Sequence, residues 1–344
     1  MRQNAFGRVV YLDLLRVLAT FAVIVLHVTC LDFPNAYRSY DWYVAAVGES
    51  LVHWAVPLFV MISGALFLNP DKVVSIADVF KKYIRRIAIA YLFWWLFYSV
   101  IVVCIKAIET KSLTIGLYMF LPHFHLWFLP MLICVYILIP LLKKISLDLT
   151  TIRYLIIVWL IYIAISFFFK HFNLSHTIIQ IQNLFQSDHI IGYAGYFLLG
   201  YYLTQKSFNK SQLRIIYLLG IVGAFIAVGG GILLSRISGF ANESFLDNLS
   251  VHNVLIATAI FVGIKENSHK IGTKVTMFLS YTQKDLFGIY LTHALWLLIL
   301  NRPLFRDLFN HAITLPIISV VIFFCSLYTT KLIRLIPRLR NVVE

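Results

Sequence analysis

Three ionisable side chains, Asp13, Arg16 and His27, lie in one apolar stretch of the sequence, YLDLLRVLATFAVIVLHV (residues 11–28). A neutral imidazole such as that of His27 can take a proton from a hydroxyl near neutral pH, or it can act as a nucleophile that carries an acyl group. The guanidinium of Arg16 is permanently charged and suits an anionic ligand. A helix with these side chains could line a passage in which an anionic ligand from the cytosol meets a base that works toward the exterior.

The spacing places the three side chains on one stripe of a helix. At about 100° per residue, Arg16 and His27 are within about 20° of one another around the axis and roughly 16 Å apart along it. Asp13 and Arg16 are three residues apart and can form an ion pair. The alternative is a simple interfacial ion pair and a buried, hydrogen-bonded histidine. Ionisable groups inside a membrane usually face a cavity, which favours the functional interpretation.

The composition predicts an all-α, polytopic membrane protein. The 344 residues are 60% hydrophobic and 13% charged, with a mean hydropathy of +0.84, well outside the range of soluble domains. Hydrophobic runs predict one transmembrane domain over residues 1–344 with ten spans. The expected spans are 9–30, 44–68, 87–105, 124–142, 154–169, 190–204, 213–235, 250–264, 285–301 and 312–333. We expect the first to be retained, because it is too polar and too long for a signal peptide.

The net charge of +14 is explained by topology. With the N-terminus in the cytoplasm, 21 of the 29 Lys and Arg residues fall on the inner side and seven on the outer side, with Arg16 inside a span. This asymmetry follows the positive-inside rule and predicts that both termini are cytoplasmic. It also removes the main argument for nucleic-acid binding. The four cysteines are scattered and predict neither disulfides nor a metal site.

Several motifs resemble the acyltransferase-3 family of integral membrane O-acyltransferases. Arg16 and His27 match its R-x10-H signature in the first span. Further matching stretches are VPLFVMISGALF (56–67), FKKYIRRI (80–87), HFHLWFLPMLI (123–133) and FGIYLTH (287–293). Within the family, the sequence is most similar to stand-alone glycan O-acetyltransferases such as that of enterobacterial common antigen. Proteins of exopolysaccharide loci that are described as exporters are a second resemblance.

The resemblance implies a reaction and a first set of roles. His27 and Arg16 would both be required, the donor would be acetyl-CoA from the cytosol, and the acceptor would be a hydroxyl of a lipid-linked or nascent glycan at the outer face. We assign His27 as general base, with an acyl-carrying nucleophile as the alternative. CoA would be a co-substrate, and we expect no permanently bound cofactor and no metal.

Other residues are candidates for donor or acceptor binding. A basic lip of Lys81, Lys82, Arg85 and Arg86 could hold the CoA phosphates, or it could reflect the positive-inside rule alone. Ser63 and Gly64 are expected to allow close helix packing, with a role for Ser63 beside the thioester as the alternative. Candidates for the acceptor side are Glu49, His53, His125, Trp127 and His293.

Each acceptor-side candidate has its own rationale. Glu49 and His53, four residues apart, could orient His27 or bind the sugar, although the family often carries Arg near His53. Trp127 could equally belong to an interfacial aromatic belt. His293 lies in the middle of a predicted span, which favours a place in the cavity.

The sequence therefore predicts an O-acetyltransferase of a bacterial cytoplasmic membrane. Its expected partners are acyl-CoA, a glycan acceptor and membrane lipids, with homo-oligomers as a further option. The rival function is a glycan transporter or flippase. Transporters commonly contain internal repeats, and no repeat is evident in this chain.

Overall fold

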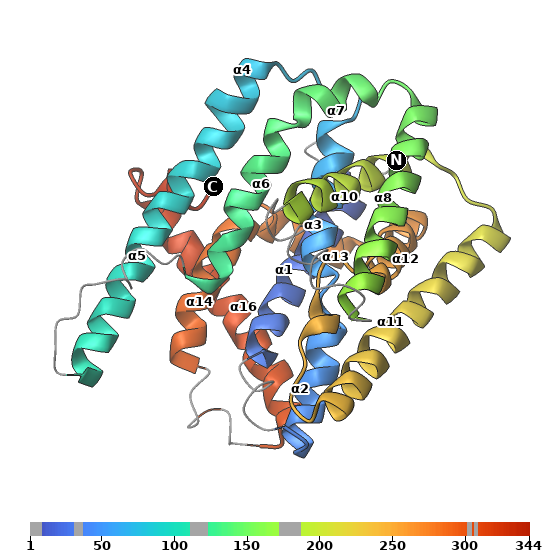
Figure 1. Cartoon of the computed structure of the whole chain (residues 1–344). Coiled ribbons are helices and arrows are strands. Elements are labelled where there is room, and N and C mark those ends of the chain that lie inside the picture. Colours follow the sequence, from blue (N-terminus) through green and yellow to red (C-terminus); the bar gives the residue numbers. More distant parts are fainter. Residues whose placement is uncertain (1–8, 31–36, 111–122, 172–186, 301–304, 306–308) are drawn as a thin grey trace.

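Helices make up the regular structure, in agreement with the predicted fold class. The computed structural model describes residues 9–30, 37–110, 123–171, 187–300, 305 and 309–344, and no β-strand occurs in this part of the chain. The main helices (Figure 1) are α1 (Val10–Thr29), α2 (Tyr40–Ser50), α3 (Ala55–Phe67), α4 (Ile76–Asp78), α5 (Arg85–Thr110), α6 (Phe128–Ile137), α7 (Ile139–Ile145), α8 (Leu149–His171), α10 (Ser187–Gln205), α11 (Lys210–Ser238), α12 (Val251–Glu266), α13 (Thr273–Thr282), α14 (Leu286–Leu300) and α16 (His311–Leu335). A 3-10 turn, η3 (Phe124–Trp127), precedes α6.

The predicted number of ten spans is not confirmed. In the described residues, seven helical stretches are long and apolar enough to cross a membrane, and α6 with α7 makes an eighth if the pair counts as one span bent by 50°. Pro140 begins the second half of that pair, where the first turn of a helix tolerates proline. The two other expected spans coincide with α10, which is less apolar, and α14, which has only 15 residues. The chain is a multi-pass membrane protein.

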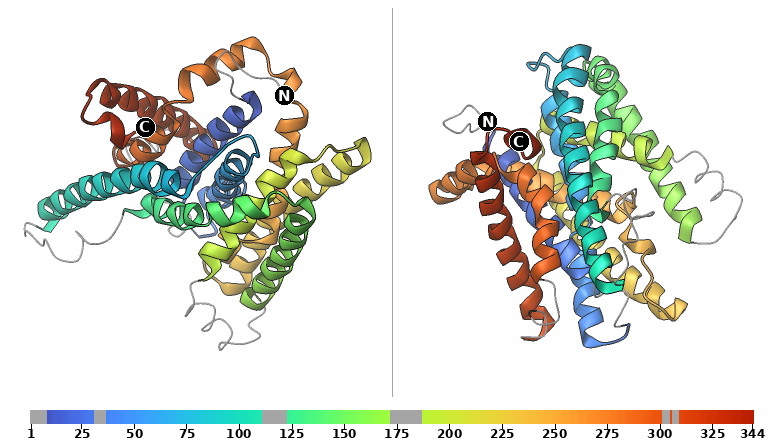
Figure 2. Two further views of the ribbon diagram at one scale, coloured as in Figure 1. Left: turned by 90° about the horizontal axis from the view of Figure 1, so that it is seen from above. Right: turned by 90° about the vertical axis from the view of Figure 1, so that its left-hand side faces the viewer.

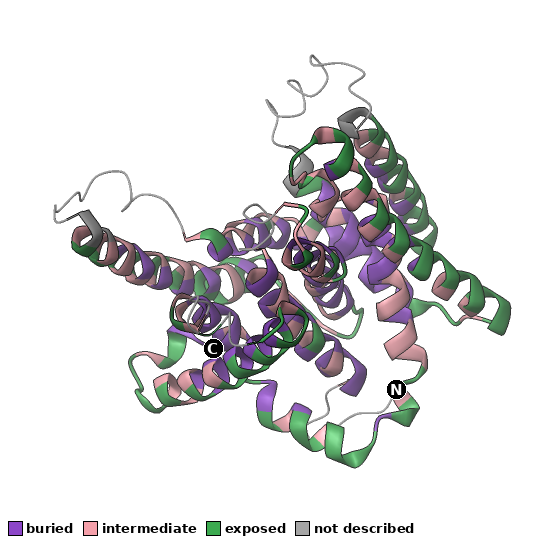
Figure 3. Ribbon diagram, turned by 90° about the horizontal axis from the view of Figure 1, so that it is seen from below, coloured by how far each residue is buried: buried purple, intermediate pink, exposed green. Residues whose placement is uncertain are grey.

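Helix α1 lies at the centre of the bundle and packs against α3, α14 and α16. Of its most apolar window, 61% is buried inside the protein, whereas only 22% is buried in the corresponding windows of α8 and α11. Figure 2 shows α1 surrounded by the other helices, and Figure 3 shows exposed residues gathered on the outer helices. The polar groups of α1 therefore face protein and not lipid, which reduces the cost of placing them in a span.

Helices α3 and α10 approach until their backbones touch. A Cβ atom on Gly64 would lie 1.8 Å from the carbonyl oxygen of Phe197, and one on Gly200 would lie 2.0 Å from that of Met61. Small residues at such a crossing let two helices pack closely where lipid offers no hydrophobic driving force. This confirms the predicted packing role of Gly64.

The two ends of α1 lie in different surroundings. Val9, Arg86 and Glu344 line one cavity, so α1 begins close to the start of α5 and to the last residues of the chain. At its other end, His27 contacts Phe124 of η3 and His293 of α14. The topology count also used Arg2, Arg8, Lys111, Arg302 and Arg306, which lie outside the described residues.

Candidate active site

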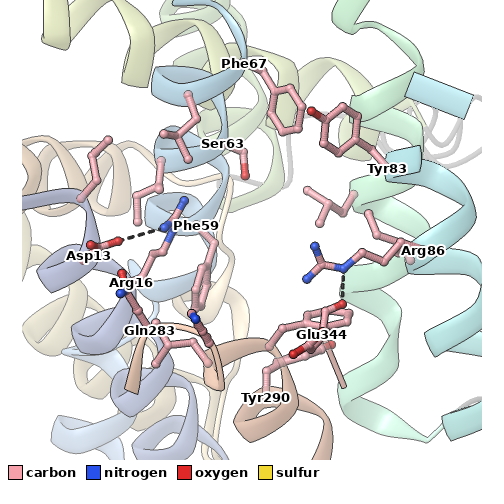
Figure 4. A pocket seen from close by; sticks show the side chains of 18 of the residues that line it. Asp13, Arg16, Phe59, Ser63, Phe67, Tyr83, Arg86, Gln283, Tyr290 and Glu344 are labelled. Carbon is pink, nitrogen blue, oxygen red and sulfur yellow. Dashed lines mark hydrogen bonds and ion pairs between the residues drawn. The ribbon is translucent and has the colours of Figure 1, made fainter. Parts of the chain in front are cut away.

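A cavity of about 810 Å³ lies at the end of the bundle where α1 begins. Side chains from α1, α3, α5, α6 and α14 line it, together with residues of the loop after α3 and of the C-terminal segment. Figure 4 shows Arg16 of α1 and Arg86 of α5 facing each other across this space. Helices distant in the sequence thus build one pocket with cationic side chains on opposite walls.

Arg16 and Asp13 form the ion pair that their spacing predicted. Arg16 Nη1 lies 3.1 Å from Asp13 Oδ1, and the Asp13 carboxylate is buried while the Arg16 side chain remains 28% exposed. The carboxylate orients the guanidinium, and part of the cation still faces the cavity.

The cavity lining carries more positive than negative side chains. It contains Asp13 and Glu344 as acids, and its bases are Arg16, Lys72, Arg86, Lys284 and Arg340. The Nε of Arg86 donates a hydrogen bond to the carbonyl oxygen of Glu344, and the Glu344 side chain pairs with Arg334 and Arg340. Burial lowers the pKa of Lys72 to about 8, with a further lowering by nearby cations. The electrostatics of the cavity favour an anionic ligand.

Only one member of the predicted basic lip reaches the cavity. Arg86 lines it, whereas Lys81, Lys82 and Arg85 are exposed and absent from the lining. Consecutive residues on a helix point about 100° apart, and Arg85 points away from the cavity wall that Arg86 and Ile87 share. The donor-binding role of Lys82 and Arg85 stays a prediction.

Ser63 lies on the cavity wall, while its neighbour Gly64 faces α10. Its hydroxyl is the polar group that the VPLFVMISGALF stretch contributes to the lining, beside the apolar side chains of Phe59, Ile62, Leu66 and Phe67. Ser63 therefore lines the cavity, and Gly64 allows α3 to pack against α10.

A group of histidines lies at the other end of α1. The rings of His27 and His293 are stacked, with centroids 5.3 Å apart and planes inclined by 19°. His125 of η3 packs edge-on against His293 at 5.1 Å, and its Nδ1 lies 2.9 Å from Nδ1 of His123. Three separate segments, α1, η3 and α14, thus bring four imidazoles together. In the described chain no three His, Cys, Asp or Glu side chains are placed to hold a metal ion.

Two nitrogens of this histidine cluster lack a hydrogen-bond partner although they are buried, namely Nε2 of His125 and Nε2 of His293. Nδ1 of His293 lies 2.5 Å from the carbonyl oxygen of Tyr290. A carbonyl only accepts, so Nδ1 carries the hydrogen and Nε2 of a neutral His293 has a free lone pair. Buried polar atoms without partners are costly, and here they point to a polar ligand.

Tyr290 connects the cavity with the histidine cluster. Its ring lines the cavity, and its hydroxyl donates a hydrogen bond to the carbonyl oxygen of His125. The same ring lies 5.7 Å from His125 and 5.9 Å from His293, measured between centroids. His27 itself is not part of the cavity lining, so the passage expected along α1 is interrupted, and Tyr290 is one of the side chains between the cavity and the histidine cluster.

Glu49 and His53 lie close to one another and near the cluster. Glu49 Oε1 is 3.7 Å from His53 Nε2, too far for a hydrogen bond, and both side chains are buried. Glu49 Oε2 and both ring nitrogens of His53 have no hydrogen-bond partner. His53 is within electrostatic range of His27. The predicted role of Glu49 and His53 in orienting His27 or binding the sugar stays a prediction.

Trp127 packs on aromatic side chains at the start of α6. Its half-buried indole packs on Tyr193 of α10, with centroids 6.2 Å apart, and on Phe128. These contacts are those of a residue that anchors η3, and the predicted acceptor contact stays a prediction.

Sequence reasoning missed Lys72, His123 and Tyr290 as members of the site. His123 and Tyr290 stand inside motifs already singled out, HFHLWF and FGIYLTH, and Tyr290 precedes His293 by three residues and so shares its helix face. Lys72 entered only the loop-charge count, and nothing in its local sequence marks it as a cavity residue.

Comparison with known proteins gives the family. A family model described as an acyltransferase domain, that of the acyltransferase-3 family, matches residues 9–331. No curated protein and no solved structure matches the chain. The family match covers most of the sequence and includes Arg16, His27, His125 and His293. The chain therefore belongs to the acyltransferase-3 family and is a membrane acyltransferase.

Proposed function

We propose that this protein transfers an acetyl group from cytosolic acetyl-CoA to a hydroxyl of a cell-surface polysaccharide or of its lipid-linked precursor. It would act in a bacterial cytoplasmic membrane with both termini inside. The observation that carries the proposal is the arrangement along α1, where a cavity rich in cations at one end adjoins a histidine cluster at the other.

The cationic end suits the donor. CoA carries phosphate groups, and charge-assisted hydrogen bonds from Arg16 and Arg86 are the strong kind that such groups receive. Ser63 lines the same cavity, where its hydroxyl would contact the pantetheine arm. From Arg16 to His27 the helix rises roughly 16 Å. An extended pantetheine arm spans this distance if Tyr290 and its neighbouring side chains move aside.

The histidine cluster suits the chemistry. His27 would take the proton of the sugar hydroxyl while its oxygen forms a bond to the thioester carbonyl carbon. The C–S bond then breaks, and the CoA thiolate recovers a proton from the His27 imidazolium. In the alternative, His27 itself attacks the thioester and passes the acetyl group to the sugar in a second step. In either scheme the acceptor would lie among four polar side chains, those of Glu49, His53, His125 and His293.

The test uses cells that assemble the glycan. Surface glycan is isolated from cells with the wild-type protein, with His27→Ala, and with the matched control His269→Gln, an exposed histidine outside the site. We expect the acetyl content to be lost in His27→Ala and kept in the control, with the amount of exported glycan unchanged. If acetylation survives in His27→Ala while export fails, the protein is a transporter and the proposal is wrong.

A further inference from the structure

Lys72 differs from Arg16 and Arg340, two other cations of the cavity, in what surrounds it. Arg16 pairs with Asp13, and the C-terminal residue Glu344 pairs with Arg340. The Lys72 ammonium instead lies over the ring of Phe67, 3.8 Å from its centroid, and 5.1 Å from that of Tyr83. Among the described residues, no carboxylate forms an ion pair with it.

Other positive charges lie around Lys72. Arg16, Lys82 and Lys143 are all within electrostatic range of its ammonium. Like charges held close together in a partly desolvated cavity repel one another, and a bound anion removes that repulsion. Phe67 and Tyr83 also restrict the position of the ammonium, and both rings line the cavity. An ordered cation without an acidic partner is what a phosphate site requires before its ligand arrives.

We propose that Lys72 is a donor-binding residue whose ammonium, held by Phe67 and Tyr83, contacts a phosphate group of the acyl donor beside Arg16. This inference rests on the proposed use of an acyl-CoA donor. It goes further because it assigns the phosphate end of that donor to the loop between α3 and α4. None of the site residues predicted from the sequence lies in this loop.

The test compares a donor that carries the phosphate-bearing nucleotide of CoA with a donor that lacks it. Acetyl-CoA and acetyl-pantetheine are supplied to the purified full-length protein with Lys72→Gln, Lys72→Arg and the control Lys144→Gln, an exposed lysine outside the cavity lining. In Lys72→Gln we expect the KM for acetyl-CoA to rise about tenfold or more, the effect of one lost charge-assisted hydrogen bond. The kcat and the KM for acetyl-pantetheine should stay unchanged, and Lys72→Arg should recover most of the affinity.

Equilibrium binding of CoA separates this inference from the proposed function. If the wild-type protein binds CoA but acetylates no glycan, the proposed function fails, and the affinities of wild type and Lys72→Gln for CoA still test Lys72. The inference is overturned if Lys72→Gln binds CoA like the wild type. It is also overturned if Lys72→Gln loses both donors equally, because that result indicates a structural role for the lysine between its two aromatic neighbours.

Discussion

The imidazole of His293 lies against that of His27, with centroids 5.3 Å apart and ring planes only 19° from parallel. Its own orientation is fixed by α14, because Nδ1 bonds to the carbonyl oxygen of Tyr290 one turn earlier. His293, held by its own helix α14, therefore limits the rotation of the half-buried His27 ring on α1. This arrangement assigns His293 a positioning role toward His27 in addition to acceptor binding.

Replacing His293 with Phe tests that role, because a phenyl ring can still stack but loses the Nδ1 donor that fixes the ring against the Tyr290 carbonyl oxygen. We expect the kcat of acetyl transfer to fall about five- to tenfold, the kinetic equivalent of one ordinary hydrogen bond. The KM for acetyl-CoA should stay constant, since His293 does not line the cavity. Steady-state kinetics of the purified variant measure both quantities, and an unchanged kcat would contradict the role.

Neutralising the Asp13–Arg16 pair should separate donor binding from folding. Arg16→Ala alone removes the positive partner of a buried carboxylate, a change that costs about 3–5 kcal/mol. The double variant Asp13→Asn with Arg16→Gln removes both charges and keeps polar side chains of similar size. We expect it to insert and to unfold near the wild-type temperature, while its KM for acetyl-CoA rises about 10- to 100-fold.

Membrane fractionation and thermal unfolding check the first part of that expectation, and kinetics check the second. A double variant that disappears from the membrane would show that the pair serves insertion. A double variant with the wild-type KM would remove Arg16 from the donor site.

Gly64 should tolerate no side chain. Gly64→Ala places a Cβ atom 1.8 Å from the carbonyl oxygen of Phe197, and both groups belong to helix backbones that cannot move independently. Overpacking of this kind costs typically about 1–3 kcal/mol or more, so we expect a lower unfolding temperature. The matched control is Gly229→Ala in α11, where a Cβ atom meets nothing within 4 Å. Equal unfolding temperatures for the two variants would show that α3 and α10 are not held at this distance.

Donor affinity should fall as the pH rises through the pKa of Lys72. Burial lowers this pKa to about 8, and lysine is charged only below its pKa. The CoA phosphates are already ionised, since the second pKa of a phosphate monoester is about 6. The dissociation constant for CoA should therefore increase from about pH 7 to about pH 9.

The matched variant for the pH series is Lys72→Arg, because a guanidinium keeps its charge throughout this range. Its dissociation constant for CoA should be nearly independent of pH. The same pH dependence in both proteins would mean that another group is titrating.

The features that depend on local sequence were predictable. Helix α1 spans Val10–Thr29 against an expected 9–30, the Asp13–Arg16 pair forms as its spacing requires, and Gly64 packs as a small residue in a membrane helix should. Each follows from helix geometry or from one residue type.

The features that depend on tertiary packing were not predictable. The family motifs marked His125 and His293 as candidates, but they follow His27 by 98 and 266 residues. No periodicity tells which faces of α14 and η3 meet each other and α1. Similarly, Glu344 contacts Arg86 because the C-terminal segment packs against Trp94. The indole Nε1 of Trp94 donates a hydrogen bond to the Val342 carbonyl oxygen, with 2.8 Å between the two atoms. The count of ten spans stays a prediction, and hydrophobicity alone did not reveal that α14 is short and that α6 and α7 are bent.

The most direct test of the account is acetyl transfer by the purified protein in liposomes, with labelled acetyl-CoA as donor and the cell's own lipid-linked glycan as acceptor. His27→Gln is compared with the wild type, and CoA binding is measured on the same samples. We predict that the variant binds CoA normally and transfers acetyl roughly 10²- to 10⁴-fold more slowly, the usual contribution of a general base. Transfer at the wild-type rate by His27→Gln would contradict the account.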